Sequence, residues 1–214
     1  MKKFMPFIAI ILLLVCAQPL IAQFGLKLSP TIGVNYNIGN GKDIRNSGSG
    51  FGAVFGAQAD LRFMPVIGII AGLQFYDDRS WSHSQEFMSQ GRPAVFDEDL
   101  KIAYFMIESL LKISIPNTGV YFIAGPAFGF NVQDSWKYTE TVSGFPPQRF
   151  SGNIDNLNVR LEFKVGSGLE IPVTHSIDLV PQISFGYGIT DMVENVSARI
   201  MSFQFTAGVK FRVI

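Results

Sequence analysis

The sequence has little cysteine, little charge and no long hydrophobic run beyond its first residues. Cys16 is the only cysteine among 214 residues, so the chain cannot form an internal disulfide. Charged residues make up 16% of the chain, and 17 basic residues balance 17 acidic ones. This balance gives no positive field for a phosphate backbone and excludes a nucleic-acid binder. No stretch of about 18 apolar residues follows Ala22, which excludes a transmembrane helix there.

The first 22 residues have the features of a secretory signal peptide. Lys2 and Lys3 form a short basic start, an apolar run occupies residues 7–17, and a small residue, Ala22, precedes Gln23. We therefore predict a cleaved signal peptide, residues 1–22, and a single exported domain, residues 23–214. An exported domain without a disulfide must gain its stability from another source.

Apolar residues follow a period of two through most of the exported domain. The alternation holds in eight windows: 24–36, 51–63, 67–75, 103–115, 120–132, 157–173, 177–189 and 201–213. Of the 56 positions with the apolar parity, 51 are apolar and none is charged or glycine. The 48 positions of the opposite parity hold 13 of the 21 glycines and 12 charged residues. This period is that of β-strands with two chemically different faces.

The volumes of the two residue sets predict which face lies inside. A soluble barrel of the lipocalin type would turn its apolar residues inward. An eight-stranded barrel has room only for a filling of side chains or one small ligand, and 51 apolar residues rich in Phe, Leu and Ile exceed that room. We therefore expect the apolar face to contact lipid and the glycine-rich, charged face to line the lumen.

The connections between the windows alternate in length. Three are tight turns with turn-forming residues, at 64–66, 116–119 and 174–176. Four are predicted long loops, at 38–50, 76–102, 133–156 and 190–200. Short periplasmic turns opposite long extracellular loops are typical of bacterial outer-membrane barrels. The sequence thus predicts an all-β fold, an eight-stranded antiparallel up-and-down transmembrane β-barrel, integral to the outer membrane and surrounded by its lipid.

The charged residues of the inner parity form the candidate site. They are Lys27, Asp60, Arg62, Glu108, Lys112, Arg160, Glu162, Lys164, Glu170, Asp178, Lys210 and Arg212. Unpaired charges in such a place are costly, so we expect a connected network of ion pairs that plugs the lumen. The alternative is a narrow porin-like channel for ions or small solutes. No phosphate loop, zinc-ligand spacing or dinucleotide motif occurs, so no cofactor or metal is expected.

The predicted loops contain residues that suggest binding or chemistry. Aromatic residues occur throughout 76–102 and 133–156, and such loops are plausible binding surfaces. The acidic run 97–99, with Asp77 and Asp78, lacks a defined metal-ligand spacing. The run Ser82-His83-Ser84 raises the alternative of a lipid-modifying barrel enzyme, but no orienting carboxylate is placed by the sequence. We expect no catalytic residue and no enzymatic activity.

Several strand segments resemble a known family. Residues 104–112 (YFMIESLLK) and 121–129 (YFIAGPAFG) resemble the central hairpin of small outer-membrane β-barrels common in Bacteroidetes, often labelled porin-like or PorT-like. Residues 168–172 and 185–190 resemble the same family. The resemblance implies the barrel fold and the outer-membrane location. The PorT-like resemblance also implies participation in a secretion or gliding apparatus, with envelope or secretion-apparatus proteins as partners. From the whole sequence we expect a structural or interaction protein of the cell envelope.

Overall fold

The computed structural model describes residues 25–40, 48–89, 91–154, 157–193 and 198–213. The predicted signal peptide lies outside these residues. The described part is almost entirely antiparallel β-structure, and it holds no helix long and apolar enough to cross a membrane. Its strands are β1 (Gly25–Asn40), β2 (Ser49–Arg62), β3 (Ile67–Asp78), β4 (Trp81–Ser89), β5 (Arg92–Ser114), β6 (Val120–Val142), β7 (Gln148–Gly152), β8 (Arg160–Leu169), β9 (Ile171–Pro172), β10 (Ile177–Gly188) and β11 (Arg199–Arg212).

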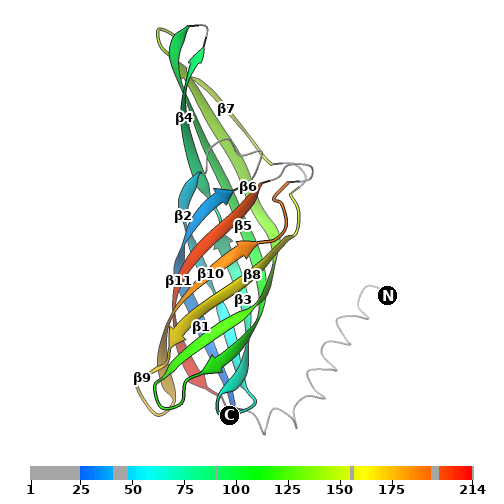
Figure 1. Cartoon of the computed structure of the whole chain (residues 1–214), viewed down its shortest axis with the longest axis vertical. Coiled ribbons are helices and arrows are strands. Elements are labelled where there is room, and N and C mark those ends of the chain that lie inside the picture. Colours follow the sequence, from blue (N-terminus) through cyan, green and yellow to red (C-terminus); the bar gives the residue numbers. More distant parts are fainter. Residues whose placement is uncertain (1–24, 41–47, 90, 155–156, 194–197, 214) are drawn as a thin grey trace, which may run out of the picture.

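Eight of these strands close into a ring, as the sequence predicts (Figure 1). The order around the ring is β1, β2, β3, β5, β6, β8, β10 and β11, and β11 pairs with β1 to close it. The short β9 continues the line of β8 after Glu170 and pairs with β10. Closure lets neighbouring strands satisfy each other's backbone N–H and C=O groups, which is the condition for crossing hydrocarbon.

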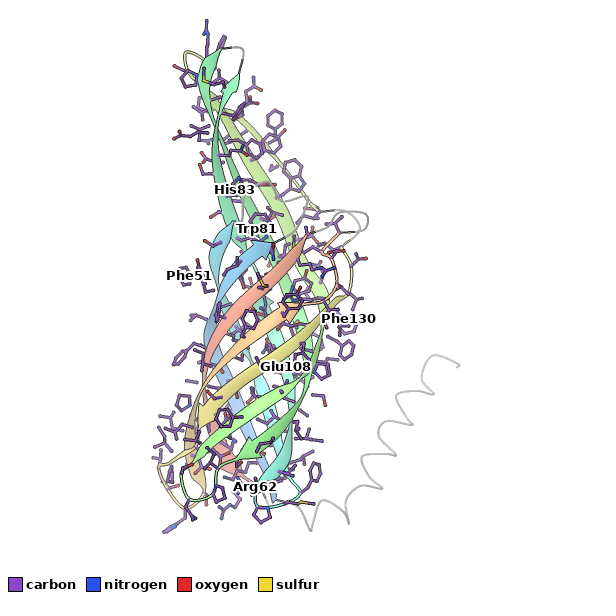
Figure 2. All side chains as sticks on the ribbon, in the orientation of Figure 1. Phe51, Arg62, Trp81, His83, Glu108 and Phe130 are labelled. Carbon is purple, nitrogen blue, oxygen red and sulfur yellow. The ribbon has the colours of Figure 1, made fainter. Side chains whose placement is uncertain are left out.

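The two faces of the ring have the polarity that the alternation predicts. Apolar side chains cover the outside, where Phe51 is 76% exposed and Ile32 is 70% exposed. Charged and amide side chains are buried inside the ring. Figure 2 shows Phe51 and Phe130 on the outer surface and Glu108 within the barrel. The hydrophobic excess of the chain therefore lies on the outside, where lipid would contact it.

Three tight turns join strands at one end of the barrel, here called the turn end. They fall at residues 63–66, 115–119 and 173–176, so the predicted short connections are confirmed. Asn117 and Gly119 in the second turn have φ values of 62° and 73°, in the left-handed region that asparagine and glycine tolerate best. The strand β1 begins at the turn end and β11 finishes there (Figure 1).

The prediction of two long loops at 76–102 and 133–156 is wrong. These residues continue the sheet beyond the opposite end of the barrel (Figure 1). The extension, here called the finger, consists of β4, β7 and the adjoining parts of β5 and β6, residues 92–102 and 133–142. Its strands pair in the order β4, β5, β6, β7. Acidic and amide residues on both faces of these strands interrupt the apolar alternation, so the sequence pattern there predicts loops.

Candidate functional site

The lumen side chains form layers between the turn end and the finger end. Leu110 lies between Glu108 and Lys112 on β5 and thereby separates two groups of charges. We call the group nearer the turns the turn-end layer; its members are Lys27, Asp60, Arg62, Lys112, Glu170, Asp178, Lys210 and Arg212. The second group is the finger-end layer; its members are Asp77, Arg79, Glu108, Arg160, Glu162 and Lys164. In Figure 2, Arg62, Glu108 and Trp81 follow one another in this order along the barrel.

Two lysines and two carboxylates form the centre of the turn-end layer. The Nζ atoms of Lys112 and Lys210 lie 2.5 Å and 2.6 Å from the same oxygen, Oδ2 of Asp60. Lys210 also lies 2.8 Å from Oε1 of Glu170, and Lys112 donates a hydrogen bond to that oxygen. Each ammonium group therefore contacts two carboxylates. Such sharing offsets the cost of removing these charges from water.

Two further basic residues, Lys27 and Arg62, contact the acidic residues around this centre. Nζ of Lys27 lies 2.7 Å from Asp178 and 3.4 Å from Glu170. Arg62 reaches Glu170 at 3.5 Å, a weaker contact, and its side chain is 39% exposed. The network thus connects β1, β2, β5, β10 and β11 across the lumen.

An apolar layer covers the turn-end charges. It consists of Ile70, Leu110, Tyr121, Ile123 and Val180, all buried. Nζ of Lys112 lies over the Tyr121 ring, 4.5 Å from the ring centroid. The Tyr121 hydroxyl donates a hydrogen bond of 3.0 Å to Gln182. A Cβ on Gly168 would collide with the Tyr121 ring, so this glycine makes room for the side chain. The glycine-rich inner parity therefore leaves space for large groups.

The finger-end layer is completely buried and its charges balance. Lys164 pairs with Glu108 and also lies 2.8 Å from Gln204, while Gln74 donates to Glu108 at 2.7 Å. Asp77 accepts two hydrogen bonds from the Arg79 guanidinium, at 2.9 Å and 2.6 Å. These contacts connect strands from opposite sides of the ring.

Glu162 links the three cations of the finger-end layer. It accepts hydrogen bonds from Arg160, and it lies 3.6 Å from Arg79 and 3.8 Å from Lys164. A Cβ on the neighbouring Gly186 would occupy the position of the Glu162 carboxylate. The lumen is therefore shaped to hold this carboxylate between guanidinium groups.

An apolar cluster lies beyond the finger-end layer, on the side of the finger. Trp81, at the start of β4, is 5% exposed and packs with Ile102, Tyr104, Met106, Ala127, Met192, Ala198 and Ile200. The indole lies against Gly39 and Gly48, where a side chain would collide with it or crowd it. Trp81 is thus part of the core of the barrel rather than of a mobile loop, and the loop prediction is wrong for it.

Eleven of the twelve predicted lumen charges are buried or partly buried in the structure, and one, Arg212, is exposed. Seven are buried: Asp60, Glu108, Lys112, Arg160, Glu162, Lys164 and Lys210. Lys27, Arg62, Glu170 and Asp178 are partly buried. Arg212 is exposed at the turn end, and it forms no ion pair with the described residues.

Sequence reasoning missed Asp77 and Arg79. The sequence predicts a loop for this segment, but β3 continues to Asp78 and contains a bulge. The bulge shifts the pairing with β5 between Gln74 and Asp77, and the pairing with β2 between Gln74 and Tyr76. A bulge inserts one residue and reverses which residues face inward. Simple parity therefore assigns Asp77 to the wrong face. Asn35, which donates a hydrogen bond of 2.5 Å to Asp77, has the inner parity, but it is uncharged and so does not belong to the predicted set of lumen charges.

The structure separates the side chains of Ser82-His83-Ser84, the run that suggests a lipid-modifying enzyme. Adjacent residues of a strand point to opposite faces. Ser82 and Ser84 therefore lie on one face of β4, while His83 lies on the other, opposite Glu98. The hydroxyl of Ser84 donates to Asp97 at 2.6 Å rather than to a base. Within the described residues, this run forms no nucleophile and base in contact.

The acidic residues considered as metal ligands also lie apart. Asp77 is in the lumen with Arg79, and Asp78 accepts hydrogen bonds from Ser80. Asp97 and Asp99 share one face of β5, and Glu98 lies on the other. The described part of the chain holds no group of three or more potential ligands.

The alternation, the closed ring and its inverted polarity agree with a family comparison. Residues 17–194 match the family model described as outer membrane protein beta-barrel domain. The chain belongs to this family. It is therefore an integral outer-membrane protein. No curated protein sequence matches the chain.

Several solved structures are similar to this member of the outer-membrane barrel family. Ail of Yersinia pestis is 15% identical, with 87% of this chain and 99% of that chain covered and a TM-score of 0.44. Neisserial surface protein A is 13% identical, with coverages of 86% and 96% and a TM-score of 0.41. CarO of Acinetobacter baumannii is 13% identical, with coverages of 84% and 96% and a TM-score of 0.37.

Proposed function

We propose that this protein is a non-enzymatic outer-membrane barrel with a closed lumen, and that its finger contacts other molecules of the cell envelope. In this proposal the three tight turns face the periplasm and the finger faces the outside, as is usual for such barrels. The sequence resemblance to porin-like and PorT-like barrels of Bacteroidetes supports an envelope or secretion-apparatus protein as the partner. The predicted signal peptide supports export.

The filled lumen carries the first part of the proposal. The finger-end layer holds three basic and three acidic side chains, all buried, and Trp81 and its cluster cover them. A solute would have to break ion pairs in a place where unpaired charge is costly. This arrangement favours a plug over the alternative of a narrow channel.

The amphipathic finger carries the second part. Its inner face, continuous with the barrel interior, holds a run of rings in contact: Trp136 and Tyr138 at 5.4 Å, Tyr138 and Phe150 at 4.6 Å, and Phe96 and Tyr138 at 5.3 Å. Its outer face is polar and charged. Among the described residues, β4 pairs on its other edge only at Ser82, and β7 pairs only with β6. A single sheet with aromatic residues and free edges is suited to bind a partner.

Planar-bilayer conductance of the purified protein tests the closed lumen. The expected result is the baseline of the lipid alone, and steady large openings would contradict the proposal. Cross-linking in intact cells tests the finger. A Tyr138→Ser, Phe150→Ser variant should lose its cross-linked species, while a Lys137→Ser, Arg149→Ser variant of the outer face should keep them. Equal loss from both variants would contradict a role for the aromatic face.

A further inference from the structure

The turn-end layer has more positive than negative charge, unlike the balanced finger-end layer. It contains five basic side chains, Lys27, Arg62, Lys112, Lys210 and Arg212, and three acidic ones, Asp60, Glu170 and Asp178. The excess of two positive charges is concentrated at the rim, because the lysines deeper in the layer already share Asp60 and Glu170. Excess charge in a partly buried place favours binding of an ion of opposite sign.

A cavity lies where this excess charge is found. Its volume is about 360 Å³, and it is lined by Gly25, Lys27, Asp60, Arg62 and Arg212. Lys27 and Arg212 are direct neighbours on the paired strands β1 and β11. Like charges in such positions destabilise a sheet. Lys27 is held by Asp178 at 2.7 Å, but Arg212 has no ion pair among the described residues and Arg62 has only its 3.5 Å contact.

We propose that this cavity binds a phosphate group through the guanidinium groups of Arg62 and Arg212. A guanidinium presents its N–H donors in a planar fork that matches the oxygens of an oxyanion. A phosphate monoester carries about −1.5 to −2 charges near neutral pH, which matches the excess of two. The site would therefore take inorganic phosphate or a monoester in preference to a singly charged carboxylate.

Asp60 supplies an independent observation. One of its oxygens, Oδ2, accepts hydrogen bonds from both Lys112 and Lys210. The other, Oδ1, is buried and has no hydrogen-bond partner among the described residues. A buried acceptor left without a donor is costly. Asp60 also lines the cavity, so the hydroxyl of a hydrogen phosphate ion bound there would bring a donor close to the carboxylate that lacks one.

Calorimetric titration of inorganic phosphate into the full-length protein in maltoside micelles tests the site. We expect saturable binding that weakens about tenfold or more in Arg212→Gln and in Arg62→Gln, as loss of a charge-assisted hydrogen bond predicts. Arg149→Gln on the finger is the matched control and should bind like the unmodified protein. Acetate should bind more weakly than phosphate. No saturable phosphate binding, or unchanged binding in Arg212→Gln, would overturn the proposal.

Two further measurements check that each variant folds and identify where the bound phosphate group comes from. Migration of each unboiled variant on a gel reports whether its barrel has folded. Should Arg62→Gln fail to fold, Arg62→Lys keeps the charge and removes the fork, and its affinity should lie between those of the unmodified protein and Arg212→Gln. Phosphatidic acid, a lipid whose headgroup is a phosphate monoester, identifies the source of the group when it is added to the same micelles. Competition with inorganic phosphate would support the phosphate chemistry and assign it to a lipid headgroup, whereas absence of competition would support a free phosphate ligand.

Discussion

Replacing Glu162 with glutamine tests whether the finger-end layer stabilises the barrel as a network. Glutamine keeps the volume of the side chain and removes its charge. Arg79 would keep its two hydrogen bonds to Asp77, and Lys164 would keep Glu108. Among the described residues, Arg160 would lose its only carboxylate, and it would keep the carbonyl of Ile200, 2.9 Å away, and its position over the Tyr104 ring. Removing one partner of a buried pair costs about 3–5 kcal/mol, so Glu162→Gln should lower the free energy of unfolding by about that amount.

A double-mutant cycle separates the network from simple packing. Arg160→Met combined with Glu162→Gln leaves Arg79 with Asp77 and Lys164 with Glu108, so the layer is neutral again. The two changes should therefore couple by about 2–3 kcal/mol, and the double variant should be more stable than the sum of its parts predicts. Urea unfolding in micelles, followed by the migration of unboiled protein, measures each value. Strict additivity would refute the reasoning, and the exposed control Arg149→Met should change stability by less than about 0.5 kcal/mol.

Two other predictions concern the finger end. Trp81→Ala should lower the free energy of unfolding by about 3–5 kcal/mol because it leaves a cavity in a buried cluster. The conductance of this variant should stay at the lipid baseline, since both charged layers remain. Stable openings would show that Trp81 alone closes the lumen. Burial raises the pKa of Glu98 above the ordinary glutamate value, and the charge of the nearby His83 lowers it by a smaller amount. The folded finger therefore holds this proton at higher pH than the unfolded chain does, so its stability should fall as pH rises from the ordinary glutamate value and then level off. Hydrogen exchange of β4 and β5 amides should show this dependence in the unmodified protein and a weaker one in Glu98→Gln; identical profiles would contradict it.

The barrel was predictable because its signal is local and repeated. A membrane strand must present lipid-compatible residues at every second position, and windows such as 120–132 and 201–213 carry that pattern without charges on the outer parity. The lumen charges followed from the same parity. Their partners did not follow, because the contacts of Glu170 and Lys210 depend on strand register and on which strands meet across the lumen.

The finger and the bulge were not predictable from parity. Residues 92–102 place Phe96 and Glu98 on the same face, so polar and apolar residues mix there and the alternation disappears. The finger strands are held by pairing to each other, a property that no single segment shows. Trp81 illustrates the consequence: in the sequence it is an aromatic residue in a polar stretch, but β4 begins there and places it over the lumen.

The different charge balance of the two layers follows from their depth in the barrel. The finger-end layer lies between two apolar clusters, where an unmatched charge would have neither water nor a counterion, and its basic and acidic residues are equal in number. The turn-end layer has an apolar cluster on one side only, and Arg62 and Arg212 at its rim remain accessible. A mobile anion can neutralise that rim, so its excess positive charge is tolerated. The same gradient of accessibility thus supports both proposals, the closed lumen at one end and the anion site at the other.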